Sequence, residues 1–373
     1  MKRAIVSVIN DLVTDQRVNK SCLALCELGY DVVLVGRRQR QSPPMDERPY
    51  ATRRMRLLFE KGPFFYAEYN IRLFLFLLFH RADFLLSNDL DTLLPNFFVA
   101  RLKRVRMVYD SHEFFTGTPE LVNRHRVQRV WERIEGFVLP KLDGMITVCD
   151  SIAAIFREKY GIRVDVIRNI PIGSNMPPKG DKAALGLPAD KRLLVLQGSG
   201  INMQRGAEEL VMAMRHLDDC LLMIIGGGDV LPKLKQMVVD EHLDDRVVFF
   251  PRMPYQEMMR YTQLAELGFC LDKDTNLNYR FSLPNKLFDF INAGVPVVAA
   301  SHLVEIAKIV RHYDIGTFVD DYAPESVAAT VRTALADVER WSRWRDNTVA
   351  AARELCWENE KKKLLAIFDG HER

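Results

Sequence analysis

One segment in the second half of the chain combines the residue types that bind a diphosphate. Residues 278–299 read NYRFSLPNKLFDFINAGVPVVA. Pro284 suits the first position of a helix, because its ring fixes the backbone dihedral that a helix needs. A helix that begins there leaves the backbone N–H groups of Asn285, Lys286 and Leu287 without partners inside the helix. With a lysine in its first turn, this helix N-terminus is predicted to bind an anion, and a diphosphate suits it.

A carboxylate follows one turn later in the same segment. Asp289 lies four residues after Asn285 and therefore on the same face of the predicted helix. From there it can accept hydrogen bonds from both hydroxyl groups of a ribose. Gly294 ends the helix, and residues 295–299 read as a buried strand. The alternative is an ordinary capped helix with Lys286 and Asp289 in solvent, and the pattern favours neither reading.

Two glycine-rich loops follow other predicted strands. In LQGSGINMQRGAEE, residues 196–209, a strand ends at Gly198 and Gly200. The loop is similar to those that wrap phosphates, yet it lacks the last glycine of G-x-G-x-x-G and is not a P-loop. We interpret Arg205, just before the next helix, as a phosphate anchor. The three glycines at 226–228 either let the backbone approach a ligand or only make a tight turn.

Polar residues also follow strands in the first half. In VYDSHEFFTGTPE, residues 108–120, a strand delivers His112 and Glu113 to a loop. His112 is a candidate for orienting a sugar hydroxyl or a phosphate near neutral pH, although a lone histidine is more often structural. Asp89 and Asp91 follow another strand, where they bind acceptor hydroxyls or, at Asp91, cap the next helix.

The loop after the first strand holds three further candidates. Asn10, Asp15 and Arg17 are predicted, with the residues just named, to lie on the acceptor side of a site. The alternative for this loop is a helix cap at Thr14 or Asp15.

The elements that must position these residues alternate along the whole chain. Short apolar runs such as residues 4–9 read as buried parallel strands, and amphipathic stretches such as 16–28 read as helices. This alternation predicts an α/β fold with two Rossmann-like, doubly wound parallel sheets. Ligands bind at the carboxyl ends of strands in such sheets, which is where the candidate residues fall. The expected strands are residues 4–9, 31–35, 83–87, 105–109, 144–148, 193–197, 220–225, 246–250, 267–271, 295–299 and 317–319.

A proline- and glycine-rich stretch divides the chain. Residues 169–191 hold four prolines and three glycines, which is typical of a linker. We therefore expect an N-terminal lobe at 1–172, a linker at 173–190 and a C-terminal lobe at 191–350. Residues 336–368 read as one or two long helices, and the last part, 351–373, is expected to pack back on the N-terminal lobe.

The composition supports a folded protein and excludes some classes. Of 373 residues, 48% are hydrophobic and 27% are charged, so the chain can bury large cores and is not disordered. The six cysteines form no C-x-x-C pair or zinc-like cluster, which fits a reducing compartment. Residues 1–168 hold 27 basic and 20 acidic side chains. This excess suits an anionic partner, unless the arginines are only a solvated surface.

Residues 37–79 form one stretch that is both basic and rich in aromatic residues. Arginines next to exposed aromatics suit peripheral contact with an anionic membrane, whereas residues 74–79 read better as the core of a helix packed on the sheet. The most apolar run, IRLFLFLLF at 71–79, is far shorter than the roughly 20 residues of a spanning helix. The apolar run at 4–9 is too short for a signal peptide. We expect a cytoplasmic protein, with peripheral contact with the inner face of the plasma membrane left open.

Taken together, these segments resemble family 4 of the retaining glycosyltransferases, which has the GT-B fold. The second half carries, in the family's usual order, LVLQGSGINMQRGAEELVMAM, LMIIGGGDVLPKL, RVVFFPRMPYQEMMRYTQLAELGFCL and SLPNKLFDFINAGVPVVA. The first half resembles a bacterial branch associated with surface-polysaccharide and lipopolysaccharide assembly through NDLVTDQRVNK, SNDLDTLLP and YDSHEFFTGTPEL. The resemblance covers nearly the whole chain.

The resemblance implies transfer of a sugar from a nucleotide-diphosphate sugar to a glycan or lipid-linked acceptor. It implies a donor held mainly by the second lobe, an acceptor on the first, and chemistry in the cleft between them. It also implies retention at the anomeric carbon without a metal ion, so no metal or other cofactor is expected. Nucleic acid is not an expected partner, because the basic residues are spread over one lobe and no recognised module is present.

Individual residues take roles from the resemblance. Arg205 stands where the family commonly has a diphosphate-binding lysine, and Lys286 where the family contacts the donor phosphate or sugar. Asp289 stands at the second glutamate of the family's E-x7-E motif, the ribose ligand, and His112 fits a histidine beside the donor sugar. The predicted catalytic residues are thus His112, Arg205 and Lys286. The predicted donor-binding residues are Gly198, Ser199, Gly200, Gly227, Ser282, Leu283, Asn285 and Asp289. The predicted acceptor-side residues are Asn10, Asp15, Arg17, Asp89, Asp91 and Glu113.

The sequence departs from the family's pattern at three places. Phe281 replaces the first motif glutamate, which often contacts the donor sugar. Asp289 is one methylene shorter than the usual glutamate. An arginine that many members carry early in the glycine loop is missing at 198–200.

These residues favour one mechanism and leave other readings open. Arg205, Lys286 and the helix N-terminus can neutralise a departing diphosphate. Since no carboxylate is an obvious nucleophile, we expect a front-face reaction in which the diphosphate takes the acceptor's proton. The alternatives are a sugar-nucleotide epimerase of the same fold, a phosphorylase, which requires a much longer chain and a pyridoxal lysine, and a non-catalytic scaffold, which Phe281 favours.

Overall fold

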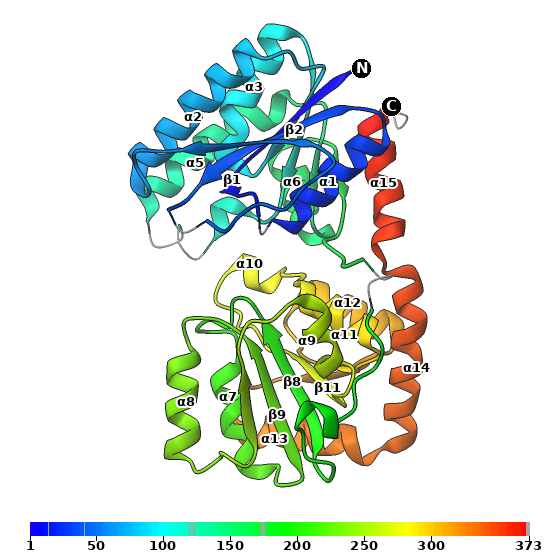
Figure 1. Ribbon diagram of the computed structural model, residues 1–373. Helices are drawn as coiled ribbons and strands as arrows, with labels where there is room; N and C mark the ends of the chain where they lie inside the picture. Colours follow the sequence, from blue (N-terminus) through cyan, green and yellow to red (C-terminus); the bar gives the residue numbers. More distant parts are fainter. Residues whose placement is uncertain (14, 41, 119–120, 122–123, 173–175, 371–373) are drawn as a thin grey trace. The chain divides into compact units, whose positions relative to one another are not determined.

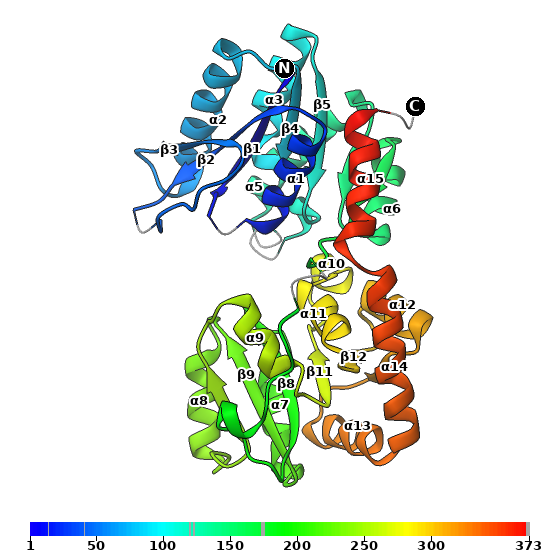
Figure 2. The same cartoon turned by 45° about the vertical axis from the view of Figure 1, so that its right-hand side comes forward.

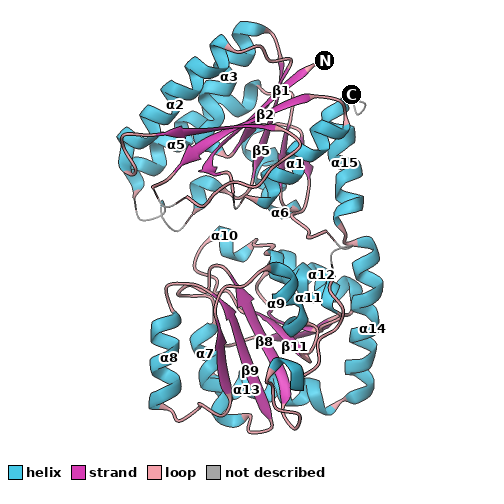
Figure 3. Ribbon diagram, viewed as in Figure 1, coloured by secondary structure: helices cyan, strands magenta, loops and turns pink. Residues whose placement is uncertain are grey.

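The computed structural model describes residues 1–13, 15–40, 42–118, 121, 124–172 and 176–370. They form two compact units, each with its own parallel sheet (Figures 1 and 3). The first unit is Met1–Arg168 with Glu360–Arg373, and the second is Asn169–Asn359. The expected fold class is therefore confirmed.

The first unit is built on a seven-stranded sheet with the order β3-β2-β1-β4-β5-β6-β7, in which every pair is parallel. Its strands are β1 (Arg3–Asp11), β2 (Asp31–Arg38), β3 (Ala51–Arg56), β4 (Phe84–Asn88), β5 (Arg106–Ser111), β6 (Met145–Thr147) and β7 (Val164–Val166). Its helices are α1 (Gln16–Glu27), α2 (Gly62–Phe79), α3 (Leu93–Lys103), α5 (His125–Val138), α6 (Asp150–Tyr160) and the 3₁₀ turns η1 (Leu90–Thr92), η2 (Phe115–Gly117) and η3 (Leu139–Lys141).

Helices cover both faces of this sheet, because the side chains that its central strands direct to the two faces are apolar. On β4, Leu85 packs in a core with Leu73 and Leu77 of α2. The neighbouring Phe84 makes an edge contact with Phe368 near the end of the chain, with ring centroids 5.5 Å apart. Both faces of β4 are thus apolar, which explains why it reads as a continuous apolar run.

The second unit is built on a six-stranded parallel sheet with the order β10-β9-β8-β11-β12-β13. Its strands are β8 (Arg192–Gly198), β9 (Cys220–Gly226), β10 (Val247–Phe250), β11 (Leu267–Cys270), β12 (Val297–Ala300) and β13 (Gly316–Val319). Its helices are α7 (Ala207–Ala213), α8 (Leu231–Asp240), α9 (Tyr255–Thr262), α10 (Leu277–Arg280), α11 (Asn285–Ala293), α12 (Val304–Tyr313), α13 (Pro324–Ala336), α14 (Val338–Glu354) and the 3₁₀ turns η5 (Ala183–Leu185) and η6 (Met214–His216). Alternate residues of β8 enter two different cores, so this sheet too is buried on both faces.

The sequence missed two strands, both at edges of the first sheet. β3 reads ATRRMR and is mostly exposed, and β7 is three residues long. Edge strands need little apolar surface, so they lack the signal that marks central strands. The core assignment of residues 74–79 was only partly right, because α2 buries Leu77 but leaves Phe79 78% exposed.

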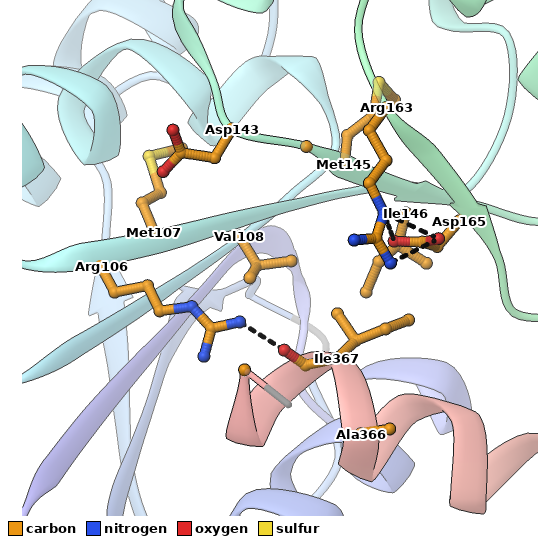
Figure 4. A pocket seen from close by; sticks show the side chains of 12 residues that line it. Arg106, Met107, Val108, Asp143, Met145, Ile146, Arg163, Asp165, Ala366 and Ile367 are labelled. Atoms are coloured by element: carbon orange, nitrogen blue, oxygen red, sulfur yellow. Dashed lines mark hydrogen bonds and ion pairs between the residues drawn. The ribbon is translucent and has the colours of Figure 1, made fainter. Parts of the chain in front are cut away.

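The last helix, α15 (Trp357–Asp369), leads from the second unit into the first. Within the first unit it lies along the face that α1 and α6 also cover (Figures 1 and 2). Arg106 of β5 donates to the carbonyl oxygen of Ile367 and, at 2.5 Å, to that of Phe368. Figure 4 shows this contact beside a pocket of about 100 Å³. That pocket lies at the amino ends of β5, β6 and β7, the end of the sheet opposite to the predicted sites.

Candidate functional site

Two loops meet closely at the carboxyl edge of the second sheet. The N–H of Gly227 donates to the carbonyl oxygen of Gly198 at 3.1 Å, and the N–H of Ile201 donates to that of Gly227 at 2.9 Å. A Cβ atom on Gly226 would overlap the carbonyl oxygen of Gly198. The glycine at 226 is therefore required by the approach of two backbones.

These loops form one wall of a pocket of about 530 Å³ in the second unit. Seven predicted residues line it: Gly198, Ser199, Gly200, Arg205, Asn285, Lys286 and Asp289. Gly226 lines it in place of the predicted Gly227, and the predicted Ser282 and Leu283 are not among its lining residues. Side chains from loops and helices more than 80 residues apart thus converge on one cavity.

The helix at this pocket begins one residue later than expected. Pro284 is its N-cap, with φ −75° and ψ 149°, and α11 starts at Asn285. The N–H of Leu287 donates to the carbonyl oxygen of Pro284 at 3.1 Å, so the expectation that it is free was wrong. The N–H groups of Asn285 and Lys286 are left at the helix start, where an anion is favoured. Gly294, with φ +71°, ends the helix as predicted.

The two cations of the pocket face a carboxylate that the sequence did not single out. Asp272 follows β11 and is fully buried. Its oxygens lie 3.6 Å from Nη1 of Arg205 and 3.8 Å from Nζ of Lys286. Neither oxygen has a hydrogen-bond partner among the described residues. The guanidinium of Arg205 also lies 5.0 Å from the centre of the Tyr279 ring. Asp272 therefore holds both cations by charge at the pocket wall.

Asp289 is a buried carboxylate held by neutral donors. The hydroxyl of Tyr255 donates to its Oδ1 at 3.1 Å, and the amide of Gln197 donates to its Oδ2 at 3.3 Å. Burial and the neighbouring charge of Asp289 raise the pKa of Tyr255, so Tyr255 stays a donor. Thr262 donates to the other end of the Gln197 amide at 2.6 Å and fixes its orientation.

A further cation of the pocket, Arg252, lies against the two glycine-rich loops. It follows β10, lines the pocket and donates to the carbonyl oxygen of Ser199 at 2.6 Å. Both Arg252 and Asp272 come directly after strands that the sequence predicted. The sequence signal for both residues is their position after a predicted strand, and it was missed because the glycine-rich loops were favoured.

In the first unit, His112 lies in a compact charged network at the carboxyl ends of β4 and β5. Its Nδ1 lies 3.2 Å from Asp89, and its Nε2 lies 3.2 Å from Oδ1 of Asn88 and 3.7 Å from Asp110. Its backbone N–H donates to Asp89 at 2.9 Å. Asp89 adopts φ +59°, an uncommon conformation for a residue other than glycine. Strain of this kind is held only where surrounding contacts fix it.

The charges in this network shift several pKa values. Burial lowers the pKa of His112, but Asp89 and Asp110 outweigh it and raise the pKa to about 9. Burial raises the pKa of Asp110, but Arg17 and His112 outweigh it and lower the pKa to about 2. Burial raises the pKa of Asp89. His112 is therefore an imidazolium donor at neutral pH and is unsuited to act as a general base.

Other predicted acceptor-side residues have structural contacts. Arg17 is 7% exposed and donates twice to Asp110, at 3.0 and 2.7 Å, and once to the carbonyl oxygen of Ile167 at 2.7 Å. This corrects its assignment, because a guanidinium with these bonds positions Asp110 rather than binding an acceptor. Asp15 is the N-cap of α1 and accepts from the N–H of Val18 at 3.1 Å. The alternative cap, Thr14, lies outside the described residues.

The remaining acceptor-side residues differ in exposure. Asn10 is exposed and its amide donates to Asp15 at 3.4 Å. Glu113 is exposed, and its carbonyl oxygen accepts from Ser111 at 2.8 Å. Asp91 is buried, does not cap a helix, and has its pKa raised well above the ordinary value by burial. The assignment of Asp91 to the acceptor side stays a prediction.

Metal-ligand clusters and membrane-spanning helices are absent from the described residues. No group of three or more His, Cys, Asp or Glu side chains among them is placed to hold a metal ion. No helix in the same part of the chain is both long and apolar enough to cross a membrane.

Two protein families match the chain, one on each side of residue 175. Residues 14–173 match the family described as Glycosyl transferase 4-like domain. Residues 180–350 match the family described as Glycosyl transferases group 1. A D-inositol 3-phosphate glycosyltransferase from Xylanimonas cellulosilytica is 24% identical over 255 residues, which are 60% of this chain and 58% of that protein. The chain thus matches less than two thirds of the length of this relative.

Solved structures with the same architecture extend over the full chain. Sucrose-phosphate synthase from Thermosynechococcus elongatus has a TM-score of 0.80 at 16% identity, with 99% of both chains covered. WaaG, a glycosyltransferase involved in lipopolysaccharide biosynthesis, has a TM-score of 0.73 at 16% identity, with 98% and 99% covered. Anabaena Alr3699/HepE in complex with UDP-glucose has a TM-score of 0.73 at 14% identity, with 99% and 100% covered. Residues 14–173 and residues 180–350 thus each match a glycosyltransferase domain family, and the whole chain has the two-lobed GT-B fold of these solved structures.

Proposed function

We propose that the chain transfers a sugar from a nucleoside-diphosphate sugar to a hydroxyl group of an acceptor, with retention at the anomeric carbon. The observation that carries this proposal is the pocket of the second unit, which combines the start of α11 with Arg205 and Lys286 and places Asp289 on the same wall. Two cations and a helix start suit a diphosphate, and a buried carboxylate suits the ribose hydroxyls.

The chemistry proposed is a front-face displacement. The bond between the sugar's anomeric carbon and the diphosphate oxygen breaks, and the acceptor oxygen bonds to the same face of that carbon. The acceptor's proton goes to the departing diphosphate. Arg205, Lys286 and the N–H groups at the start of α11 stabilise the negative charge that develops on the diphosphate. We propose that these groups supply the electrostatic stabilisation without a metal ion.

The donor and acceptor follow from chemistry and from fold relatives. UDP and UDP-glucose are the first donors to test, because the structure of Alr3699/HepE holds UDP-glucose. We propose a precursor of a surface polysaccharide as the acceptor, in keeping with the role of WaaG in lipopolysaccharide biosynthesis. Such a precursor places the protein on the cytoplasmic side of the membrane.

The test is nucleotide binding followed by turnover. UDP and UDP-glucose should raise the melting temperature of the wild type without added metal, and Arg205→Ala and Asp289→Ala should remove the shift. Arg215→Ala is the matched control, because Arg215 is exposed, pairs with Glu241 and is not among the pocket's lining residues. If UDP, UDP-glucose and a panel of other nucleoside diphosphates all leave the melting temperature of the wild type unchanged, the donor site is refuted and a non-catalytic scaffold is favoured.

A further inference from the structure

An apolar groove opens on the first unit, far in sequence from the donor pocket. It lies between α2, α3 and α5, has a volume of about 900 Å³ and is lined mainly by apolar side chains. Five of them are large and exposed: Ile71 (61%), Leu75 (45%), Phe98 (43%), Val127 (44%) and Val130 (53%). Exposed apolar side chains that share one groove mark a binding surface rather than chance exposure.

One end of this apolar groove adjoins the charged network around His112. Leu90 lines the groove and directly follows Asp89, which contacts His112. On the groove's wall, Trp131 packs edge-on against Phe115, three residues after His112, with ring centroids 5.1 Å apart. At this end the side chain of Asn70, which also lines the groove, donates to the carbonyl oxygen of Asp91 at 2.9 Å. A long molecule in the groove would therefore extend toward hydrogen-bonding groups at one end.

The surroundings of the groove are strongly basic. Arg124 and Arg126 lie on its rim, and both are exposed. A second pocket of about 700 Å³, the basic pocket, adjoins the start of α2, since its Lys61 precedes the first groove residue, Gly62. The basic pocket is lined by Arg37, Arg38, Gln39, Arg40, Arg56, Leu57, Phe59, Glu60 and Lys61. Its single carboxylate, Glu60, pairs with Arg40 at 3.0 Å, so four cations remain for an anionic group.

We propose that the apolar groove binds the hydrocarbon chain of an acceptor lipid that carries a phosphate. This proposal rests on the proposed function, because the lipid is an acceptor only if the chain is a glycosyltransferase. A hydrocarbon chain matches the groove lining, and its phosphate matches the adjoining cations. An uncharged apolar protein segment would cover the groove but leave these cations without a counter-charge.

Binding of a soluble probe lipid tests the proposal directly. The probe is dodecyl phosphate below its micelle concentration, titrated into the full chain by calorimetry. Each methylene buried adds affinity by roughly fourfold, so octyl phosphate should bind at least tenfold more weakly and inorganic phosphate weaker still. Dodecyltrimethylammonium has the same chain with the opposite charge and should also bind at least tenfold more weakly.

Variants of exposed residues separate the groove from the rest of the surface. Ile71→Glu and Val130→Glu should each weaken dodecyl phosphate binding at least tenfold, because the chain would lie against a charge. Leu102→Glu is the matched control, since Leu102 is 66% exposed on α3 and is not among the groove's lining residues. Its binding should stay within twofold of the wild type. A far-UV circular dichroism spectrum and a hydrogen-exchange pattern of the first unit that match those of the wild type show that each variant is folded.

Two results would overturn the proposal. In the first, the wild type fails to bind dodecyl phosphate; in the second, both groove variants bind it as the wild type does. If the first result comes with a loss of binding to phosphatidylglycerol vesicles or of self-association in the groove variants, this face is assigned to a bilayer or to a second copy. Failure of the lipid tests with an intact UDP shift rejects this inference alone. Loss of the UDP shift with dodecyl phosphate bound rejects the transferase function and leaves a lipid site.

Discussion

Asp272 fixes the positions of the two cations at one wall of the donor pocket. It is fully buried, and its charge lies within 4 Å of both Arg205 and Lys286. A buried carboxylate without hydrogen-bond donors is costly unless cations face it. The contacts thus act in both directions, because Asp272 fixes the cations and the cations make its burial tolerable.

Replacing Asp272 by asparagine should therefore destabilise the protein. The substitution keeps the size but leaves two cations facing a neutral amide, which should cost about 3 kcal/mol in the free energy of unfolding. Asp274→Asn is the matched control, because Asp274 is an exposed partner of Arg280 and should change stability by at most about 0.5 kcal/mol. Urea unfolding measures both. Equal effects of the two substitutions would contradict the role given to Asp272.

Asp289 allows a separate test of the ribose contact. Asp289→Asn should weaken UDP binding by about tenfold or more, because a hydrogen bond to a charged group contributes roughly 1.5–3 kcal/mol. Binding of inorganic diphosphate, which has no ribose, should stay within about twofold. Calorimetric titration of both ligands measures the difference. A parallel loss for both ligands would instead place Asp289 in support of the helix N-terminus.

At the scale of elements, the charged network of the first unit depends on where three elements end or begin. β4 and β5 carry Asp89, Asp110 and His112 to one edge of the sheet, and α1 brings Arg17 to Asp110 across 93 positions of sequence. The arrangement raises the pKa of His112 to about 9, above its ordinary value of about 6.5. A group whose pKa is higher in the folded than in the unfolded state stabilises the folded protein, and this contribution is lost when the pH rises above the folded-state pKa.

The free energy of unfolding should therefore fall as the pH rises from about 6.5, the ordinary pKa of histidine, to about 9, the pKa of His112 in the folded protein. The contribution of His112 is fully present below about pH 6.5 and is lost as the pH approaches 9, which amounts to roughly 1–3 kcal/mol. Guanidinium unfolding of the wild type at intervals from pH 6 to 9.5 should show this decrease. His112→Gln should be less stable at pH 6 and should show a flatter profile. If the variant loses as much stability as the wild type over that interval, another group is responsible.

At the scale of the whole molecule, the two units are separate cores joined twice by the chain. The boundary falls after Arg168 and again within α15, before Glu360. The last residues therefore stabilise the unit that contains the first residues. The buried Phe368 on Phe84 and the bonds from Arg106 to the end of α15 are the contacts that do so.

Removing the Phe368 ring should thus destabilise the first unit selectively. Phe368→Ala should cost about 3–5 kcal/mol in that unit, whereas Phe79→Ala, at a 78% exposed ring, should cost at most about 0.5 kcal/mol. Hydrogen exchange should speed up in β4 and β5 of the variant and stay unchanged in β8 and β9. Equal acceleration in both sheets would mean that the units unfold together.

The sequence by itself determined the fold class, most strands and the helix start that faces the donor pocket. A buried parallel strand is a continuous apolar run, and a helix start has its own signals, so neither needs distant residues to be recognised. That is why residues 193–197 and 285–289 could be placed from the chain alone. The exposed edge strand Ala51–Arg56 carried no such signal.

Only the tertiary structure decided which of the predicted loops share a site. The order β10-β9-β8-β11-β12-β13 brings the ends of β8 and β11 together and sets Asp272 between Arg205 and Lys286. In the first unit, too, a contact between distant segments corrected a prediction, because Arg17, predicted to bind the acceptor, pairs with Asp110. Strand order depends on pairing between segments far apart in sequence, which local periodicity does not encode. The helices and strands could therefore be predicted from the sequence, but which of their side chains lie in contact depends on the order and packing of the strands.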